Sequence, residues 1–395
     1  TPMDRKLAEL FDGEYIRAND GTQLDGGIED DKLWQDNYRR IIVYPLSQYD
    51  LPGSTLGRSF IKLLAGEIDG VRERKWNMEK VLCFMSTILQ TSPDVKGSAN
   101  IRKRVTQRLL DWENKKYRML ISSTVLCAEA QMNRKRGVLT IKERAKIFSS
   151  LICRGKLRAA IRYASEREKG GILMPDDVDE KSGDLVSEVL ASKHPIGRDV
   201  EISSLPIFEF CPELINIEVT EDSVEKVARR LSGSAGPSGI DSVAMSHWLL
   251  KFGGASSKLR RSIAKFVEWL ANDYPPWAAY RAMTWSRLVG LDKCPGVRPI
   301  GIGDILRRLL CKTLLIVVGK EATRACGIDQ LCSGLEAGIE GGIHHMRSMW
   351  DEHEGDKEEW GVLLIDAKNA FNEGNRKMML WVCLLYTSPS PRDSR

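Results

Sequence analysis

One carboxylate in this sequence is placed where it can do chemistry. Asp366 directly follows residues 362–365, an apolar run that is typical of a buried strand. A carboxylate at the tip of a buried strand is costly unless it is paired or binds a cation. Because oxygen ligands on rigid strand ends suit Mg²⁺, Asp366 is the best candidate for a metal ligand. The plainer alternative is an aspartate that only ends a strand and starts a turn.

Two cations lie on a second feature, a predicted β-hairpin. Residues 286–291 and 297–302 have the pattern of two strands around a Pro- and Gly-containing turn. Pro299 confines the second strand to a sheet edge, because proline has no N–H to donate. Such an edge would expose Lys293 and Arg298 to a polyanion. The alternative for Lys293 is an ordinary turn lysine.

The positive charge of the chain is segregated. Residues 101–168 hold 18 Lys or Arg against 6 Asp or Glu, although the net charge of the whole chain is only +5. Trp112 and Tyr117 stand near these cations and could stack on bases. The pattern predicts nucleic acid as the partner, and the alternative is a solvated helix face. The candidate phosphate-binding residues are Arg102, Lys103, Arg104, Lys115, Lys116, Arg134, Lys135 and Arg136.

Helix signals organise most of the remaining chain. Apolar periodicity predicts helices over residues 76–90, 224–231, 247–252, 258–271 and 305–321, the last capped by Asp304. Thr140 and Glu143 form a capping box for a helix that ends near Gly155.

These signals divide the chain into regions. We expect residues 1–100 to be an acidic or mixed region whose first 36 residues form a flexible arm, and residues 101–171 to be a basic helical region that binds nucleic acid. Residues 172–218 are expected to be an irregular connector. The Ser/Pro-rich residues 384–395 resemble translated adaptor sequence, and we expect them to be a non-native tail.

The order of motifs between Ala235 and Arg376 resembles that of the reverse transcriptases of non-LTR retrotransposons. Residues 235–239 match the family's Ala-Gly-Pro-Asp-Gly-type loop, with Ser238 in place of the aspartate. Lys293 and residues 298–300 match its Lys and Arg-Pro-Ile, and residues 366–371 match its Asp-x-x-x-Ala-Phe block. Residues 330–335 replace its Gln-x-Gly-Phe segment without the aromatic residue.

The resemblance implies an α+β fold, with a helical N-terminal region followed by the fingers and partial palm of a right-hand polymerase over residues 219–383. Asp366 and the Ala367 carbonyl would bind two Mg²⁺ ions. Arg298, assisted by Lys293, would hold the triphosphate of a dNTP. Phe371 would exclude a 2′-hydroxyl, which disfavours an RNA-dependent RNA polymerase, although plain core packing is its alternative. The partners implied are an RNA template, a DNA primer and dNTP.

One departure from the family limits this interpretation. The family has a later Asp-Asp pair, whereas the only aspartate after Asp366 here is Asp393. Since one carboxylate cannot organise two magnesium ions, we expect this chain to be an inactive fragment of an RNA-directed DNA polymerase. The alternative is a non-catalytic nucleic-acid-binding remnant of a retroelement protein.

Composition excludes several other classes. With 42% hydrophobic and 29% charged residues the chain is globular, and its longest apolar run is too short to cross a membrane. Nine cysteines without a CxxC favour reduced thiols and an intracellular location, in the nucleus or the cytoplasm. The adjacent His344 and His345 lack the paired spacing of a zinc site, so no structural zinc is expected.

Overall fold

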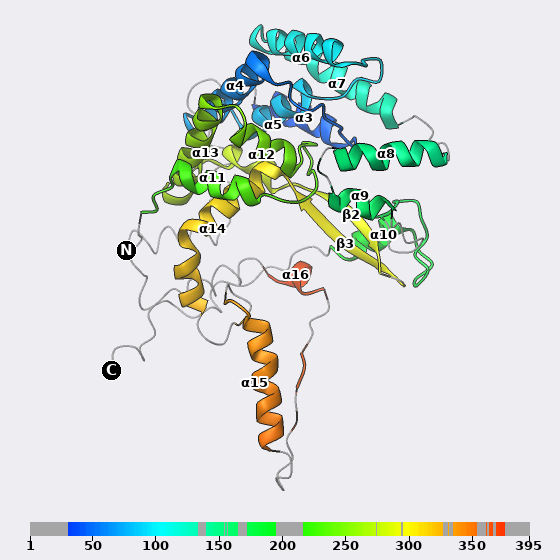
Figure 1. The fold of residues 1–395 in the computed structure, drawn as a ribbon, viewed down its shortest axis with the longest axis vertical. Helices are drawn as coiled ribbons and strands as arrows, with labels where there is room; N and C mark the ends of the chain where they lie inside the picture. Colours follow the sequence, from blue (N-terminus) through cyan, green and yellow to red (C-terminus); the bar gives the residue numbers. More distant parts are fainter. Residues whose placement is uncertain are drawn as a thin grey trace.

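The computed structural model describes residues 31–132, 140–153, 155, 157–164, 172–194, 216–273, 275–293, 295–326, 331, 335–353, 361, 363–365 and 369–375. They form a helical body, a small antiparallel sheet beside it, and a helix, α15 (Gly338–Glu352), that extends away from both (Figure 1). The fold is therefore α+β, with much more helix than strand.

The helical body combines two groups of helices that are distant in the sequence. The first group is α3 (Asp31–Ile42), α4 (Ser54–Arg72), α5 (Met78–Ile88), α6 (Ser98–Glu113) and α7 (Tyr117–Met132), and the second is α11 (Glu221–Arg230), α12 (Ser242–Leu250), α13 (Gly254–Asn272) and α14 (Ile305–Cys326). Helix α4 packs along α13, and both groups contribute to one continuous buried core (Figure 1). Three of the regions expected from the sequence, residues 1–100, 101–171 and 219–383, therefore contribute described residues to the same core.

Aromatic side chains fill the centre of this core. Phe60 stacks on Phe84 with ring centroids 5.0 Å apart, and Trp248 meets Phe60 edge-on at the same distance. Trp112 contacts Phe84 and is only 2% exposed, while Tyr117 lies 4.9 Å from Trp112. The expectation that Trp112 stacks on bases is therefore wrong, because its ring is buried in the core. Tyr117 is only partly buried and packs against that core, so its stacking on bases stays a prediction.

The acidic segment that we expected to be a flexible arm contains the start of α3. The Asp31 carboxylate accepts hydrogen bonds from Asn77 Nδ2 at 2.6 Å and from Arg281 Nη2 at 3.0 Å. Arg281 also pairs with the fully buried Glu79, Nε to Oε1, at 2.7 Å. Residues 31–36 therefore belong to a helix that is fixed to two distant segments, and the expectation of a flexible arm is wrong for them.

The predicted hairpin is confirmed as β2 (Ser286–Asp292) and β3 (Val297–Gly303). A third strand, β1 (Ile172–Leu173), pairs antiparallel with β2, so the strand order is β1-β2-β3 and Pro299 lies on an edge strand as predicted. Helix α10 (Val186–Ser192) packs on one face of the sheet through Val186 and Leu190. The expected connector 172–218 therefore contributes a strand and a helix to the hairpin.

Shorter helices complete the described structure. Helix α8 (Ile141–Cys153) begins with the predicted capping box, because Thr140 N donates to Glu143 Oε2 at 2.8 Å and Glu143 N donates to Thr140 Oγ1 at 3.3 Å. Helix α9 (Leu157–Ala164) follows, and α16 (Ala370–Glu373) comes after the Asp366 position. The 3₁₀ turns Trp277–Ala279 and Arg281–Thr284 lead from α13 into β2.

The apolar run before Asp366 differs from the prediction. Residues 363–365 belong to no strand, and Leu363, Leu364 and Ile365 are 82–84% exposed. A strand needs a neighbour to satisfy its backbone N–H and C=O groups. Within the described residues no strand pairs with this run, so the expectation of a buried strand is wrong there.

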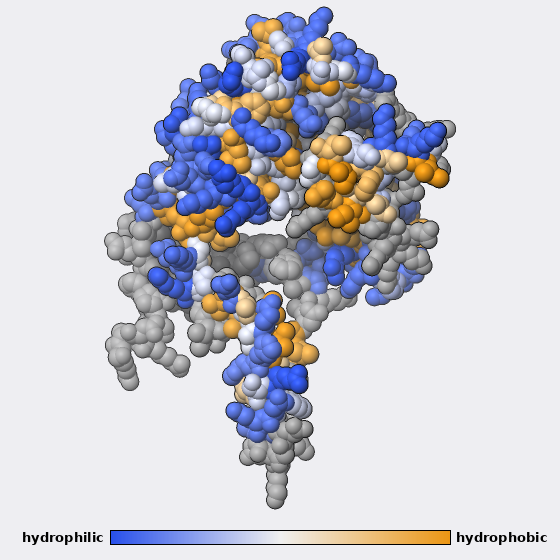
Figure 2. All heavy atoms as spheres, in the orientation of Figure 1, coloured by the Kyte–Doolittle hydropathy of each residue, from blue (hydrophilic) through white to orange (hydrophobic). Residues whose placement is uncertain are grey.

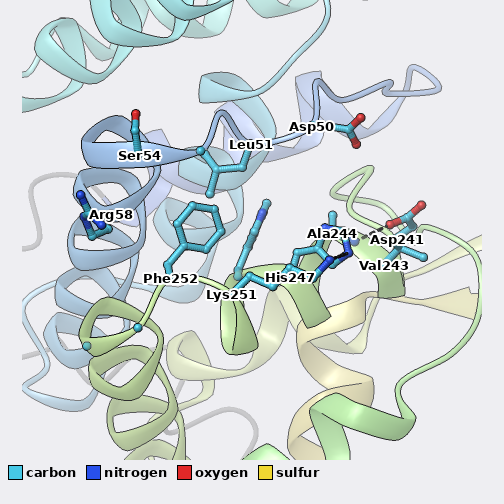
Figure 3. Close-up of a pocket in the computed structure, with 14 residues that line it drawn as sticks. Asp50, Leu51, Ser54, Arg58, Asp241, Val243, Ala244, His247, Lys251 and Phe252 are labelled. Atoms are coloured by element: carbon cyan, nitrogen blue, oxygen red, sulfur yellow. Dashed lines mark hydrogen bonds between the residues drawn. The ribbon is translucent and has the colours of Figure 1, made fainter. Parts of the chain in front are cut away.

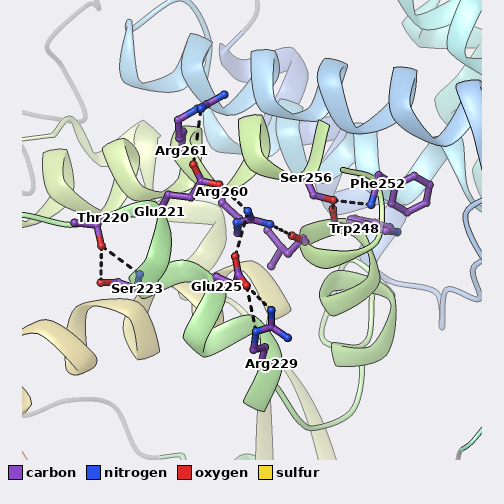
Figure 4. Close-up of polar contacts among 11 residues, drawn as sticks. Thr220, Glu221, Ser223, Glu225, Arg229, Trp248, Phe252, Ser256, Arg260 and Arg261 are labelled. Atoms are coloured by element: carbon purple, nitrogen blue, oxygen red, sulfur yellow. Dashed lines mark hydrogen bonds and ion pairs between the residues drawn. The ribbon is translucent and has the colours of Figure 1, made fainter. Parts of the chain in front are cut away.

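A partly buried arginine, Arg260, links α11, α12 and α13 (Figure 4). Arg260 pairs with Glu221 at 2.7 Å and with Glu225 at 3.2 Å, and it donates to the carbonyl of Leu249 at 2.6 Å. Ser256 Oγ donates to Trp248 O at 2.7 Å, which closes the turn between α12 and α13. These bonds hold α11, α12 and α13 of the second group against one another.

Two glycines on α4 test the packing of the body. A Cβ on Gly70 would lie 2.0 Å from the Trp76 ring, whereas a Cβ on Gly66 would meet nothing within 4 Å. We expect Gly70→Ala to lower the free energy of unfolding by about 1–3 kcal/mol through overpacking. Gly66→Ala, the matched control, should raise it by up to about 1 kcal/mol through helix propensity. Urea unfolding followed by circular dichroism measures both, and equal stability of the two variants would contradict this packing.

Candidate nucleotide and nucleic-acid interface

The hairpin presents its cations as the sequence predicts. Lys293 and Arg298 are both exposed, and the turn between them closes through Lys293 N and Gly296 O at 2.7 Å. Gly296 has a φ of +107°, a conformation that favours glycine. The two cations therefore lie at the solvent end of a closed turn.

A second arginine shares a sheet face with Arg298. The register pairs Leu291 with Arg298 and Arg287 with Ile302. Because side chains alternate along a strand, Arg287 and Arg298 project from the same face, four residues or roughly 14 Å apart. Arg287 is exposed as well. This face therefore offers two charged groups suited to phosphates at a separation set by the strands.

The surface around the hairpin also carries apolar side chains. Ile172 is 67% exposed on β1, and Ile161 is 62% exposed on α9. Figure 2 shows apolar residues gathered over the region where Figure 1 places α9, β2 and β3. Ile172 and Ile161 are aliphatic and give no aromatic ring on which a base could stack, so phosphate contacts by the cations are what this surface offers to a nucleic acid.

The hairpin is anchored to the body by one buried carboxylate. Asp304 follows β3 and is fully buried; its Oδ1 accepts from Leu306 N at 3.0 Å, so it caps α14 as predicted. Its Oδ2 accepts from Ser238 N at 3.0 Å. Burial raises the pKa of the Asp304 carboxyl, and the hydrogen bonds from Ser238 and Leu306 oppose that rise.

The loop at residues 235–239 is a structural partner of that carboxylate. Ser238 O accepts from Ser86 Oγ at 3.1 Å, which ties the loop to α5. A Cβ on Gly236 would lie 2.6 Å from Asp304 Cα, so only glycine permits this approach. Two segments that the family resemblance selects, the loop and the hairpin, are thus in direct contact.

The block that contains Asp366 is described only in part. Asp366 and Ala367 lie outside the described residues; Phe371 lies in α16, and its side chain is also outside what the structure describes. The residues next to them are placed: Asn369 Nδ2 and Asn372 Nδ2 donate to the carbonyl of Lys193 at 2.9 and 2.8 Å. The block therefore docks at the C-terminal end of α10.

Lys193 also contacts the hairpin. Its Nζ donates to the carbonyl of Val297, the residue before Arg298. Sequence reasoning missed Lys193, Asn369 and Asn372 as a set, because the lysine lies more than 170 positions from both asparagines. The only available signal was that both asparagines fall within or next to the Asp-x-x-x-Ala-Phe block.

The basic clusters are only partly available to a polyanion. Arg102 and Lys103 on α6 are exposed, and so is Lys115, which follows the helix. Arg104 pairs with Asp94 at 3.2 Å, and Lys116 pairs with Asp111 at 3.1 Å. Arg134, Lys135 and Arg136 lie outside the described residues. Part of the local positive excess is therefore balanced by carboxylates.

A cavity elsewhere in the body contains none of the residues predicted from the sequence. It has a volume of about 450 Å³ and lies where α4 and α13 begin (Figure 3). Figure 3 shows Arg58 at one side and Asp50 and Asp241 at the other. Lys251 Nζ lies 3.0 Å from His247 Nε2 between them. Its lining is of mixed charge, which does not select one class of ligand.

Neither a metal cluster nor a membrane helix is found in the described part of the chain. Among these residues no three His, Cys, Asp or Glu side chains gather as metal ligands. The expected magnesium ligands Asp366 and Ala367 lie outside them, so the described residues provide no magnesium site. None of the described helices combines the length and apolar character that crossing a bilayer requires.

Replacing Asp304 tests the anchor of the hairpin. Asp304→Asn keeps one acceptor oxygen but turns an NH₂ toward a buried backbone N–H, so we expect a loss of about 1–3 kcal/mol in the free energy of unfolding. Asp241→Asn is the control, because asparagine caps α12 as well as aspartate and should change stability by less than about 0.5 kcal/mol.

The same comparison has a pH dependence of known sign. A carboxyl whose pKa is raised in the folded state contributes stability that is present below its ordinary pKa of 3.8 and is lost as the pH rises through the folded value. The difference in unfolding free energy between the unmodified chain and Asp304→Asn should therefore shrink as the pH rises from the ordinary pKa of 3.8 through the raised folded value. A difference that grows with pH would contradict the raised pKa.

No model of a protein family matches this chain, and neither a curated protein nor a solved structure matches it. Its function is therefore inferred from its own residues and their contacts.

Proposed function

We propose that the chain is part of a reverse transcriptase of the non-LTR retrotransposon type, comprising the fingers and the beginning of the palm. The complete enzyme would extend a primer 3′-hydroxyl with dNTPs on an RNA template. One observation carries the proposal: the three segments that the resemblance selects lie in one assembly. Loop 235–239 contacts the base of the hairpin through Ser238 and Asp304, and residues 369–372 reach the hairpin through Lys193.

Arg298 and Lys293 are the residues assigned to the incoming nucleotide. The Arg298 guanidinium presents a planar set of donors that fits phosphate oxygens, and Lys293 adds a point charge at the adjoining turn. Both are exposed, so a triphosphate can reach them. Phe371, at the position after Ala370, is assigned to the exclusion of a 2′-hydroxyl.

Two Mg²⁺ ions would activate the primer hydroxyl in the complete enzyme, with Asp366 and Ala367 among their ligands. This chain carries one of the aspartates that such a site needs, since Asp393 is the only later one. We therefore assign no metal-dependent step to the chain as it stands. It binds nucleotide and nucleic acid without extending a primer.

A second candidate is a non-catalytic nucleic-acid-binding protein derived from a retroelement. It is favoured by residues 363–365, which are exposed and belong to no strand, so the described residues lack the buried strand that would support Asp366. The exposed Arg102 and Lys103 on α6 would serve either candidate, because phosphate contacts alone suffice for binding.

Titration with a fluorescent dNTP tests the nucleotide site. We expect Arg298→Ala to weaken dNTP binding about tenfold, because it removes charge-assisted hydrogen bonds to phosphate. Lys265→Ala, an exposed charge on α13, is the control and should leave the affinity within about twofold. Equal affinities for Arg298→Ala and the unmodified chain would remove the basis of the nucleotide assignment.

The catalytic part of the proposal is tested by sequencing the source transcript across codon 383. We expect the frame to continue into an apolar strand with an Asp-Asp pair. In the protein that includes it, Asp366→Ala should abolish primer extension on RNA, whereas Asp351→Ala, an exposed carboxylate on α15, should not. A native frame that lacks the pair, or an active Asp366→Ala enzyme, would leave only the binding function.

A further inference from the structure

The C-terminal end of α10 is the meeting point of two elements that the proposed function requires to cooperate. Lys193 is the C-cap residue of α10, so its carbonyl has no partner within the helix. Two side-chain amides, Asn369 Nδ2 and Asn372 Nδ2, donate to that carbonyl at 2.9 and 2.8 Å. The docking therefore satisfies a helix end that would otherwise lack a donor.

The docked segment is shaped for this contact. Asn369 has a φ of +55°, which asparagine tolerates better than most residues, and its carbonyl accepts from Asn372 N at 2.9 Å. Asn372 Nδ2 also donates to Asn369 Oδ1 at 2.9 Å. The two amides are thus held beside each other by bonds within their own segment.

Helix α10 is in turn fixed to the hairpin. Val186 and Leu190 of α10 pack with Val297 in a small apolar cluster, and a Cβ on Gly290 of β2 would lie only 3.2 Å from Val186 Cγ1. The Lys193 ammonium then donates to Val297 O. Any change in the position of α10 must therefore move the backbone next to Arg298.

We propose that Lys193 is a positioning residue that couples the Asp366 block to the Arg298 hairpin. Its carbonyl accepts from Asn369 and Asn372, and its ammonium donates to the hairpin, so one residue links residues 369–372 to the backbone next to Arg298. The expected effect on dNTP binding rests on the proposed function. The docking of residues 369–372 on Lys193 rests on the hydrogen bonds alone. The measured ligand is a deoxynucleoside triphosphate, whose binding the proposed function assigns to Arg298.

Variants of Lys193 test the coupling by titration of the whole chain with a fluorescent dNTP. Lys193→Met keeps the aliphatic stem and loses the ammonium, and we expect it to weaken binding at least about fivefold, because small displacements of a binding group are costly. Lys193→Arg keeps a charged donor and should restore the affinity to within about twofold. Lys265→Met on α13 is the charge-matched control.

Hydrogen exchange of residues 369–373 measures the docking independently of ligand. Asn372→Ala removes one amide, and Asn369→Gly removes the other while it accepts the positive φ. Both should speed exchange in this segment at least about tenfold, because its anchoring bonds are lost. Unchanged exchange in both variants would overturn the docking and with it the proposal.

The outcomes separate this inference from the proposed function. If Arg298→Ala weakens dNTP binding but Lys193→Met does not, the nucleotide site stands and the coupling by Lys193 is overturned. If Arg298→Ala has no effect either, the proposed function itself fails. A loss with Lys193→Met that Lys193→Arg does not restore would show a merely structural role and would also overturn the coupling.

Discussion

The described structure depends on the buried carboxylate of Asp304. It accepts one hydrogen bond from the first turn of α14 and another from the loop at Ser238, so it joins the end of the hairpin to both. A buried carboxylate is costly when its donors are missing, which makes this junction sensitive to any shift of either segment. The same loop accepts a hydrogen bond from Ser86 of α5, so the hairpin is connected through Asp304 and Ser238 to the helical body.

Much of the fold could be predicted because its signals are local. The hairpin, the capping box at Thr140 and the Asp304 cap each depend on a few neighbouring residues, and all three are confirmed. The predictions were wrong where contacts between distant segments determine the local structure. The acidic composition of residues 31–36 suggested a flexible arm, but they belong to α3, whose Trp34, Tyr38 and Ile41 are buried. The contacts of Asp31 with Asn77 and Arg281 join segments that local composition does not relate.

The features of the candidate site also divide into those that local sequence predicts and those that depend on distant contacts. The exposure of Lys293 and Arg298 followed from an edge strand and a turn, which local residue types specify. The burial of Trp112 could not be seen from its basic neighbours, because a helix can be charged on one face and apolar on the other. The contact of Lys193 with Asn369 and Asn372 joins segments that no sequence pattern relates.

Residues 363–365 and residues 369–372 precede and follow Asp366 in the sequence. The two segments differ in how they are supported by the rest of the described structure. The first segment has no strand partner among the described residues, while the second is held by two amides on one carbonyl. A ligand site requires support on both sides of its ligand. Among the described residues, contacts of this kind are found on the downstream side of Asp366, where the carbonyl of Lys193 holds Asn369 and Asn372.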